Sequence, residues 1–507
     1  MSELELKFQV PPGGRPGLLK AVGHRELERM KLHARYFDTT DHLLGRHGMA
    51  LRLRSENGTW VQTLKAGSAH SLERLEENVE LAAADDGGQM PPDPARHVGT
   101  EAGTRLAKLL KANGQPPLVE VYRTEVDRCK RLLHSHGANV EWALDEGTIV
   151  AGAHVRPLLE LELEYKGGEM GGLYAMAHDW QARHGLWLDP VPKAQRGAML
   201  EEGHAFVAPV KAEPPLLVRR MDGDRTLRAM IAASLSQILP NASEIAAGST
   251  DPEHVHQLRV GMRRLRTAVR EFERFAGGLD PRWQAAFDAV FDAAGESRDR
   301  HVLRTELAPE LERAGAPLPD PFDGDEELLK TLRAKVHAAP FQAALLQLLA
   351  FAHARGPALP AAASEDEADD DHAPGTDDKG EAIRHLQDRL GRLHRQVTQD
   401  AGRFESLTIE EQHRLRRRLK RLRYLAQFAS PLFRPRRVEV WLNSLEPAQD
   451  ALGHHIDRAV AARRFADAAA SDPRAWFGAG WFCGQLADTA HDGRKALERF
   501  ARAAVFW

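Results

Sequence analysis

Charged and apolar side chains alternate in three short runs of the N-terminal part of the chain, ELELKF, LRLR and LELELEY. In an extended strand alternate side chains lie on the same face, so each run collects its charges on one face. The charged positions are Glu3, Glu5, Lys7, Arg52, Arg54, Glu160, Glu162 and Glu164. Carboxylates bind hard cations such as Mg²⁺ or Mn²⁺ through oxygen, and arginine and lysine neutralise phosphate oxygens. These are the residue types that metal-assisted phosphoryl transfer requires.

A basic helical pattern occurs twice in the C-terminal part. In VHQLRVGMRRLRTAV and QHRLRRRLKRLRYLA, a histidine is followed by cations three, seven and ten positions later. The positions are His256, Arg259, Arg263 and Arg266, then His413, Arg416, Lys420 and Arg423. Each set falls within roughly 80° of one helix face, where like charges repel by a few tenths of a kcal/mol per pair. One interpretation is a solvated helix face. Because both segments carry the same unfavourable repulsion, an anionic ligand is favoured instead, and its binding should become tighter when the histidines are protonated.

The alternating runs predict strands, which must position the first set of charges. They are Leu4 to Phe8, Ala50 to Arg54, Trp60 to Lys65, Leu75 to Leu81, Val140 to Leu144 and Leu158 to Tyr165. A simple amphipathic sheet with its charges in water is one interpretation. Acidic and basic strands that all carry apolar residues on the opposite face instead favour a closed antiparallel barrel, with a charged lumen and an outside covered by helices.

From residue 216 onward the pattern is helical, so the fold class is α+β: an N-terminal barrel followed by an all-α domain. Helices are expected near 225–239, 254–276, 281–296, 299–314, 325–354, 381–400, 408–428, 437–452, 455–470, 473–489 and 493–505. The expected domains are 1–205, a linker at 206–215, and 216–507 with halves 216–360 and 381–507. The acidic stretch 361–380 between the halves is expected to be a disordered loop.

The composition sets broad limits on the protein. Its 507 residues are too many for one ordinary core, and 42% hydrophobic with 28% charged residues is typical of a globular protein. The net charge of −4 does not by itself indicate a nucleic-acid partner. Cys129 and Cys483 predict neither a disulfide framework nor a cysteine metal site, and no signal peptide or membrane span is expected. We expect a cytoplasmic protein.

The N-terminal part resembles the CYTH domain, whose fold is the triphosphate tunnel. The family's ExExK signature corresponds to ELELK at Glu3, Glu5 and Lys7. Further motifs follow in the family's order, namely LRLR, QTLK, ERLEENV, VYRT, EWALDEGTI, LELELE and PKAQRG. They contain Arg52, Arg54, Lys65, Arg74, Glu76, Asn78, Arg123, Glu141, Asp145, Glu160, Glu162, Glu164, Lys193 and Arg196.

The resemblance implies a role for each of these positions. Glu3, Glu5, Glu160 and Glu162 would hold a divalent cation, Mg²⁺ or Mn²⁺. The phosphates would be bound by Lys7, Arg52, Arg54, Lys65, Arg74, Arg123, Lys193 and Arg196. Lys7, Arg54 or Arg123 would stabilise the developing charge, and Glu76 and Asp145 would orient water or neighbouring groups. No single general base is assigned.

The region from Leu216 to Trp507 resembles the CHAD domain. The resemblance implies two pseudo-symmetric helical bundles beside a basic pore, and binding of inorganic polyphosphate. The matching positions are His256, Arg259, Arg263, Arg264, Arg266, His413, Arg416, Lys420, Arg421, Arg423 and Tyr424. Aspartate-bearing turns of the family correspond to Arg298 and Asp299 and to Asp457. His301 stands where the family usually has a second aspartate, which leaves the role of that segment open.

The leading hypothesis is a metal-dependent inorganic triphosphatase with a polyphosphate-binding helical domain. One alternative is a nucleotide-type enzyme, an adenylate cyclase or a thiamine triphosphatase. Another is a non-catalytic polyphosphate sensor. An aromatic content of only 6% disfavours a nucleoside, and the complete set of tunnel charges disfavours a pure sensor. Tripolyphosphate and inorganic polyphosphate are the expected ligands, with association to polyphosphate granules. Sequence-specific nucleic-acid readout and membrane binding are not expected.

Overall fold

The computed structural model describes residues 2–23, 25–56, 58–67, 73–81, 90–316, 325–354 and 380–507. The side chains of Ser2, Glu3, Glu56, Glu73, Arg74 and Asp325 also lie outside this description. The sequence-based expectations for the side chains of Glu3 and Arg74, and for the acidic segment 361–379, therefore lie outside the described residues.

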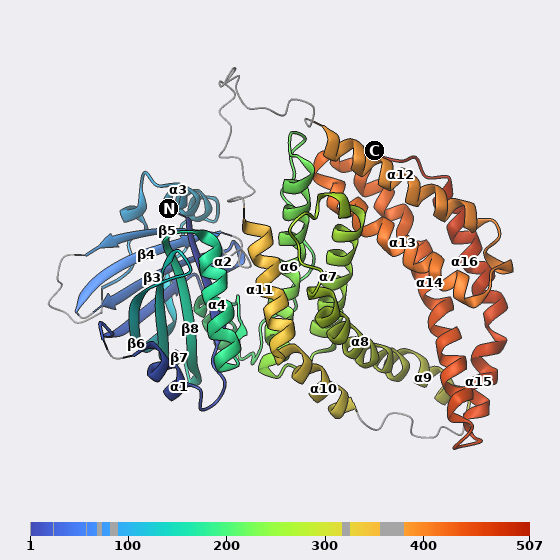
Figure 1. Cartoon of the computed structure of the whole chain (residues 1–507), viewed down its shortest axis with the longest axis horizontal. Coiled ribbons are helices and arrows are strands. Elements are labelled where there is room, and N and C mark those ends of the chain that lie inside the picture. Colours follow the sequence, from blue (N-terminus) through green and yellow to red (C-terminus); the bar gives the residue numbers. More distant parts are fainter. Residues whose placement is uncertain are drawn as a thin grey trace.

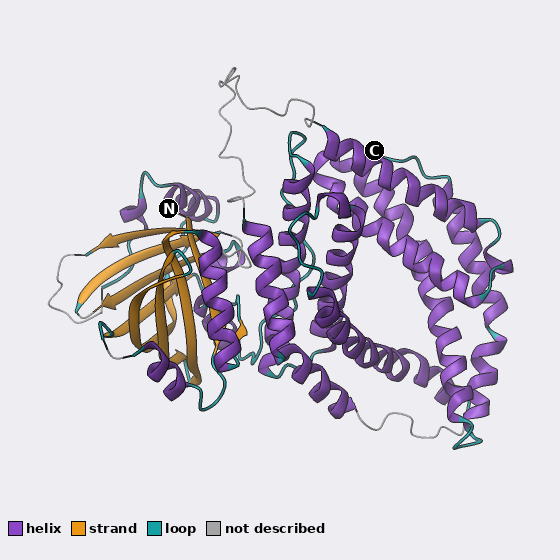
Figure 2. Cartoon of the chain, viewed as in Figure 1, coloured by secondary structure: helices purple, strands orange, loops and turns teal. Residues whose placement is uncertain are grey.

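The N-terminal domain is an antiparallel barrel (Figures 1 and 2). Its strands are β1 (Ser2–Gln9), β2 (Glu28–Asp38), β3 (Met49–Glu56), β4 (Thr59–Ala66), β5 (Glu73–Glu80), β6 (Val119–Ser135), β7 (Ala138–Ala151), β8 (His154–Gly168) and the short β9 (Trp187–Leu188). They follow the order β5-β4-β3-β2-β6-β7-β8-β1, and β1 also pairs with β5, which closes the sheet. The predicted closed barrel is confirmed.

On most strands, including β1, β3, β7 and β8, the apolar side faces outward and packs mainly against helices. Against the outside of β7 and β8 lies α4 (Met170–His184), whose Trp180 ring contacts Trp142 at a centroid distance of 5.6 Å. Against β3 and β4 lie α2 (Leu43–Arg46) and α3 (Glu101–Ala112), where Leu51 and Leu64 pack on Leu106. The charged side of these strands therefore lines the lumen, because side chains alternate across a strand.

One end of the lumen is closed by α5 (Lys193–Glu201). Its alanines pack on Tyr36 and Tyr122, which lie on the inner face and stack at 4.6 Å. Gly197 permits this approach, since a Cβ there would lie 2.2 Å from the Tyr122 ring. The remaining helix of the barrel, α1 (Arg15–Val22), lies at the outside of the sheet.

The C-terminal domain is helical (Figure 2). Its helices are α6 (Gly223–Ala247), α7 (Pro252–Glu271), α8 (Trp283–Val302), α9 (Ala308–Arg313), α10 (Asp325–His337), α11 (Ala339–His353), α12 (Glu381–Ala401), α13 (Ile409–Ala429), α14 (Pro435–Ala468), α15 (Ala475–Gly484) and α16 (Leu486–Ala501). The two repeated basic segments form α7 and α13, which contact each other. No helix among the described residues has the length and apolar character to cross a bilayer.

Several helix boundaries differ from the prediction, and two of these differences involve a proline. The segment 325–354 is two helices rather than one, because the backbone turns to an extended conformation at Ala338 and Pro340 begins a new helix. In contrast, 437–452 and 455–470 are one continuous helix, α14, which runs through Pro447. Packing against α13, α15 and α16 holds α14 together along its length.

The barrel and the helical domain share one apolar core. It extends from Leu6 and Trp142 of the barrel through α4 to α6 and α11. The segment predicted as a linker is also docked, since the backbone N–H of Val210 donates to Asn241 of α6 at 3.2 Å. The two domains therefore meet along a packed interface.

Candidate active site and anion-binding surface

The barrel lumen separates its charges onto opposite walls. Counted around the closed sheet, β3 lies four strands away from β8 on either side. β3 contributes Arg52 and Arg54 to the inner face, whereas β8 contributes Glu160 and Glu162. The other inner-face charges include Glu5, Lys7, Lys65, Glu76, Arg128, Lys130, Glu141, Asp145 and Glu164. An anionic chain inside the lumen would meet a basic wall on one side and carboxylates on the other.

Lys193 projects from the start of α5 into the acidic wall. Its ammonium lies 2.9 Å from a carboxylate oxygen of Asp145 and 2.9 Å from one of Glu160, and it also pairs with Glu162. Burial opposes its charge, but these carboxylates outweigh burial and raise the pKa of Lys193 well above its usual range. Lys193 is therefore a permanent cation that bridges strands β7 and β8.

Arg128 is the inward arginine of β6, and it is not among the residues predicted from the sequence. Its guanidinium donates twice to Asp145, with both nitrogen–oxygen distances at 2.6 Å, and also pairs with Glu162. Such bidentate pairing fixes the orientation of both carboxylates. The residue that the family motif suggested, Arg123, is not brought into the lumen.

Arg123 lies on the outer side of β6, where its side chain is 45% exposed and pairs with Glu125 at 3.4 Å. The strand alternates, so the odd positions from Arg123 to Asp127 face solvent and the even positions from Tyr122 to Arg128 face inward. The mixed charges at the odd positions were a signal of a solvated face. This register removes Arg123 from the proposed site.

The basic wall holds a carboxylate of its own. Glu76 on β5 pairs with Lys65 and lies 3.4 Å from a nitrogen of Arg52. Burial alone would raise the pKa of Glu76, but Lys65 and Arg52 outweigh it and lower the pKa to about 2. Glu76 therefore stays ionised and orients the cations around it. Asn78, also on β5, accepts a hydrogen bond from Thr63 at 2.7 Å.

The carboxylates Glu5 and Glu162 fit a divalent cation by their chemistry. Burial, and then the charge of Glu162, raise the pKa of Glu5 to about 7. Among the described residues no hydrogen bond or ion pair engages the Glu5 carboxylate, and the charges of Lys65, Lys193 and Lys7 only partly offset the rise in its pKa. A hard cation with oxygen ligands would give this carboxylate a direct partner. No three acidic or histidine side chains within the described residues form a metal cluster.

Two further predicted residues, Lys7 and Arg196, occupy different environments. Lys7 lines the lumen, donates to the carbonyl of Val191 and lies 3.7 Å from Glu160. Arg196 is not brought to the lumen wall. It is a buried residue of α5 and pairs with Asp189 at 2.5 Å and with Glu244 of α6 at 3.1 Å.

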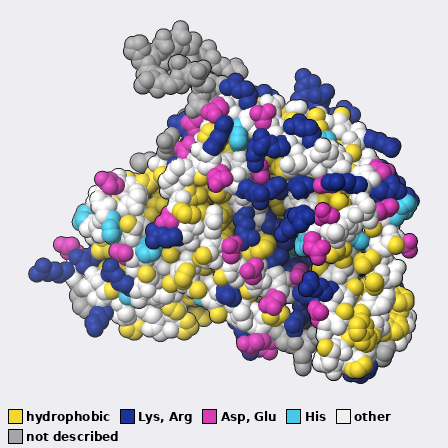
Figure 3. Space-filling model, turned by 45° about the vertical axis from the view of Figure 1, so that its right-hand side comes forward, with side chains coloured by type: hydrophobic (Ala, Val, Ile, Leu, Met, Phe, Trp, Pro, Cys, Tyr) yellow, Lys and Arg dark blue, Asp and Glu magenta, His cyan; other side chains and the backbone are white. Residues whose placement is uncertain are grey.

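In the helical domain, α7 and α13 face each other with their basic stripes. Figure 3 shows lysine and arginine side chains gathered in a hollow of this domain. Burial, and then the charges of Arg416 and Arg263, hold the pKa of Lys420 well below its usual range. Since Arg263 belongs to α7 and Lys420 to α13, the two stripes form one cationic surface.

Arg263 and Lys420 have no directly paired acceptor within the described part of the chain, although the charge of Asp457 partly opposes the lowering of the Lys420 pKa. Neither side chain has a hydrogen bond or an ion pair there, although both are half-buried. The Arg263 guanidinium instead lies 5.4 Å from the centre of the Phe291 ring. Uncompensated cations held this close together are stabilised by an anionic ligand.

The arginines three positions after each histidine occupy equivalent places in the two halves. Arg259 lies against Gly295 of α8, where a Cβ would come within 2.5 Å of its guanidinium. Arg416 lies in the same way against Gly453 of α14 and pairs with Asp457 at 3.2 Å. This correspondence fits the predicted pseudo-symmetry of the two halves.

The histidines that begin the stripes are shifted away from protonation. Burial lowers the pKa of His256, and Arg298 lowers it further, while Glu253 opposes the change. Burial and the nearby cations Arg417 and Arg416 lower the pKa of His413. These histidines are therefore expected to become protonated, and to strengthen anion binding, only at a lower pH than their ordinary pKa indicates.

Several predicted polyphosphate residues have structural partners instead. Arg264 is buried and donates to the carbonyl of Glu213 at 2.7 Å and to Gln237 at 3.1 Å. Arg421 lies 3.3 Å from the buried Glu271 and ties α13 to α7. These two residues are not brought onto the open stripe.

The last stripe positions, Arg266 and Arg423, are half-buried. Arg266 pairs with Asp288, and Arg423 donates to Gln449 at 2.6 Å. Tyr424, which follows Arg423 in α13, is buried. The central part of the surface is therefore formed by His256, Arg259, Arg263, His413, Arg416 and Lys420.

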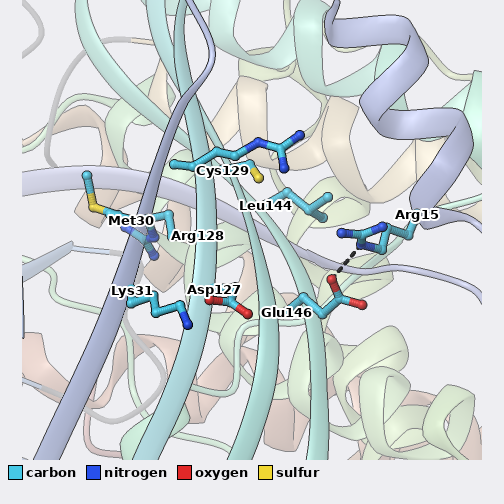
Figure 4. A pocket seen from close by; sticks show the side chains of 9 residues that line it. Arg15, Met30, Lys31, Asp127, Arg128, Cys129, Leu144 and Glu146 are labelled. Carbon is cyan, nitrogen blue, oxygen red and sulfur yellow. Dashed lines mark ion pairs between the residues drawn. The ribbon is translucent and has the colours of Figure 1, made fainter. Parts of the chain in front are cut away.

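A separate pocket of about 400 Å³ lies on the outer side of the barrel (Figure 4). Its lining includes Arg15, Lys31, Asp127 and Glu146, and Arg15 pairs with Glu146 at 2.5 Å. Its floor contains Cys129. Asp127, Cys129 and Glu146 lie on the strand faces opposite to the lumen, whereas Arg128 lines both this pocket and the candidate active site.

Comparisons with known proteins agree with this division of the chain. Residues 1–198 match the family described as the CYTH domain, and residues 229–466 match the family described as the CHAD domain. An inorganic triphosphatase of Haemophilus influenzae is 26% identical over 208 residues, which are 39% of this chain and 55% of that protein. The chain thus spans about half the length of this curated relative.

Two solved structures are similar to separate parts of the chain. The CHAD domain of the plant Ricinus communis is 25% identical, covers 57% of this chain and 96% of its own, and has a TM-score of 0.44. A Hippeastrum protein described as an adenylyl cyclase with a dominant triphosphatase activity is 17% identical. It covers 41% of this chain and 98% of its own, with a TM-score of 0.29.

Proposed function

Because the chain is a CYTH domain followed by a CHAD domain, we propose that it is a divalent-cation-dependent inorganic triphosphatase whose helical domain binds inorganic polyphosphate. The observation that carries the enzymatic part is the lumen with arginines on one wall and carboxylates on the other. A linear triphosphate needs both: cations for its oxygens, and ligands for the metal that accompanies it.

The proposed roles follow from the two walls. Arg52, Arg54 and Lys65 bind the phosphate oxygens and hold the chain along the lumen. Lys193 and Arg128 keep the carboxylates of β7 and β8 ionised and oriented, and Lys193 also offers its ammonium to the phosphoryl group under attack. Glu5, Glu160 and Glu162 would hold the divalent cation. When bound, that cation polarises a phosphoryl oxygen and lowers the pKa of water.

An inorganic substrate is favoured over a nucleotide. Tyr36 and Tyr122 of the inner face stack on each other and pack on α5, so their rings are already engaged. A nucleobase would need such a ring for stacking. The attached cationic surface of α7 and α13 also suits an inorganic phosphate chain.

The test is phosphate release by the whole protein with Mg²⁺ or Mn²⁺. Tripolyphosphate, ATP, thiamine triphosphate and long-chain polyphosphate are compared at equal concentration. Tripolyphosphate is expected to be hydrolysed fastest. Faster release from ATP or thiamine triphosphate would favour the nucleotide-type enzyme, and binding without release from any substrate would favour a sensor.

Polyphosphate binding is expected to weaken at least tenfold in the double variant Arg263→Ala, Lys420→Ala. Each substitution removes a charge-assisted contact of about 1.5 kcal/mol or more. Titration of long-chain polyphosphate at fixed salt measures the loss, and the dependence of affinity on salt should become shallower.

Wild-type affinity for polyphosphate should also fall as the pH rises, because the lowered pKa of Lys420 means that this residue loses its charge at a lower pH than an ordinary lysine.

The matched control is Arg270→Ala, Arg414→Ala. It also removes two positive charges from α7 and α13, but from exposed positions outside the stripes. Its affinity should stay within about twofold of wild type, since exposed charges contribute little. An equal loss in both double variants would mean that net charge, rather than the cationic surface, binds polyphosphate.

A further inference from the structure

Glu244 is a buried carboxylate of the helical domain that points at the barrel. It lies near the end of α6 and is fully buried. One oxygen accepts from Arg196 of α5 at 3.1 Å, and the other accepts from the backbone N–H of Val207 at 3.3 Å. Burying a carboxylate requires such partners, so this contact holds the helical domain against α5.

Arg196 shares its guanidinium between Glu244 and a second buried carboxylate, Asp189. The Arg196–Asp189 distance is 2.5 Å. Asp189 also accepts from Ser243 of α6 at 2.9 Å. Two neighbouring residues of the helical domain therefore bind this region: Ser243 contacts Asp189 just before α5, and Glu244 contacts Arg196 within α5.

That segment continues directly to the lumen. The backbone N–H of Val191 donates to Asp189 at 3.0 Å, and the carbonyl of Val191 accepts from Lys7. Gln9 donates to Asp189 at 2.6 Å and to Glu160 of the acidic wall at 3.1 Å. Lys193 follows two residues after Val191 and begins α5. Asp189 thus connects the helical domain to two lumen cations and one lumen carboxylate.

We infer that Glu244 and Ser243 are positioning residues for the tunnel, which hold Lys193 and Lys7 at the acidic wall through Asp189 and Arg196. This inference rests on the proposed function, since Lys193 and Lys7 are assigned there to triphosphate. It makes tight triphosphate binding in the barrel depend on the docked helical domain, independently of polyphosphate bound to α7 and α13.

A double-mutant cycle in the full chain tests this dependence. Glu244→Gln keeps the side-chain size but removes the charge that Arg196 pairs with. In the presence of Lys193 it is expected to weaken tripolyphosphate binding about tenfold, measured by calorimetry without divalent cation. In the Lys193→Gln background the same change should have a clearly smaller effect, because only the part transmitted through Lys7 remains. Equal effects in both backgrounds, or no effect in either, would overturn the inference.

Tyr174→Phe is the matched interdomain control. Tyr174 of α4 contacts His353 of α11 at 2.6 Å across the same interface, away from the lumen segment. This variant should leave tripolyphosphate affinity unchanged. If it weakens binding as much as Glu244→Gln, the interface acts only through general stability.

A second readout does not depend on triphosphate. Amide hydrogen exchange in residues 189–196 should rise in Glu244→Gln and remain at the wild-type level in Tyr174→Phe. Unchanged exchange in Glu244→Gln would overturn the inference. A wild type that binds tripolyphosphate without hydrolysing it would contradict the proposed reaction but not the inference. Should Glu244→Gln not fold, Ser243→Ala, which removes one hydrogen bond to Asp189, enters the same measurements with the same expected direction.

Discussion

Replacing Lys193 by glutamine is expected to lower kcat/KM for tripolyphosphate by about a hundredfold or more. The loss has this size because removal of one preorganised donor at a reacting group costs a factor of about 10² to 10³. Lys193 also lies against three carboxylates, Asp145, Glu160 and Glu162, which repel one another once it is gone. Steady-state phosphate release at saturating Mg²⁺ or Mn²⁺ measures the change.

Lys108→Gln is the matched control for this variant. Lys108 is an exposed lysine of α3 on the outer side of the barrel, so its replacement removes the same charge without touching the lumen. Its kcat/KM should equal that of the wild type. A Lys193→Gln enzyme that is well folded and retains wild-type kcat/KM would exclude Lys193 from the reaction.

The second large effect concerns Glu5. Glu5→Gln should abolish most divalent-cation-dependent turnover, because it removes the carboxylate with no partner among the described residues. In the wild type, protons should compete with the cation: the pKa of Glu5 is about 7, so the concentration of cation needed for half-maximal activity should rise as the pH falls below 7. Activity titrations with Mg²⁺ and Mn²⁺ at pH 6, 7 and 8 test this. Full turnover of Glu5→Gln at saturating cation would remove Glu5 from the metal site.

Stability without metal provides an independent measurement. The pKa of Glu5 is raised in the folded protein, from an ordinary value of 4.5 to about 7, so the folded state binds the extra proton between these values. The stabilising contribution of Glu5 is therefore complete below pH 4.5 and is lost as the pH rises through 7. In metal-free buffer, the Tm of the wild type should fall more steeply than that of Glu5→Gln between pH 5 and pH 8.

The charged lumen could be predicted from the sequence because alternation in a strand is a local property. Glu5, Arg52 and Glu162 lie inward because their neighbours on both sides are apolar and must be buried. β6 was different. In VYRTEVDR the mixed charges Arg123, Glu125 and Asp127 share one register, which is typical of a solvated face, but Arg123 was predicted from its place in the family motif and Arg128 was not predicted. The pairing of β6 with β2 and β7 decides that register.

Helix boundaries show the same limit. The 3.6-residue period predicted α7 and α13 closely, since both have a clear apolar side. The break at Ala338 and the continuity of α14 through Pro447 depend on what packs beside each helix. Helix propensity is a weak local preference that tertiary packing overrides.

The sequence by itself determined the closed barrel, the inward charges of most strands and the two basic helix faces, because each follows from periodicity within one element. Only the tertiary structure decided which cations have partners. Arg196, Arg264 and Arg421 read as ligand-binding cations, yet each meets a buried acceptor from a distant segment. Arg263 and Lys420 were also predicted to bind a ligand, and neither pairs with an acceptor among the described residues. The energy of a buried charge depends on what lies opposite it, which no local pattern specifies.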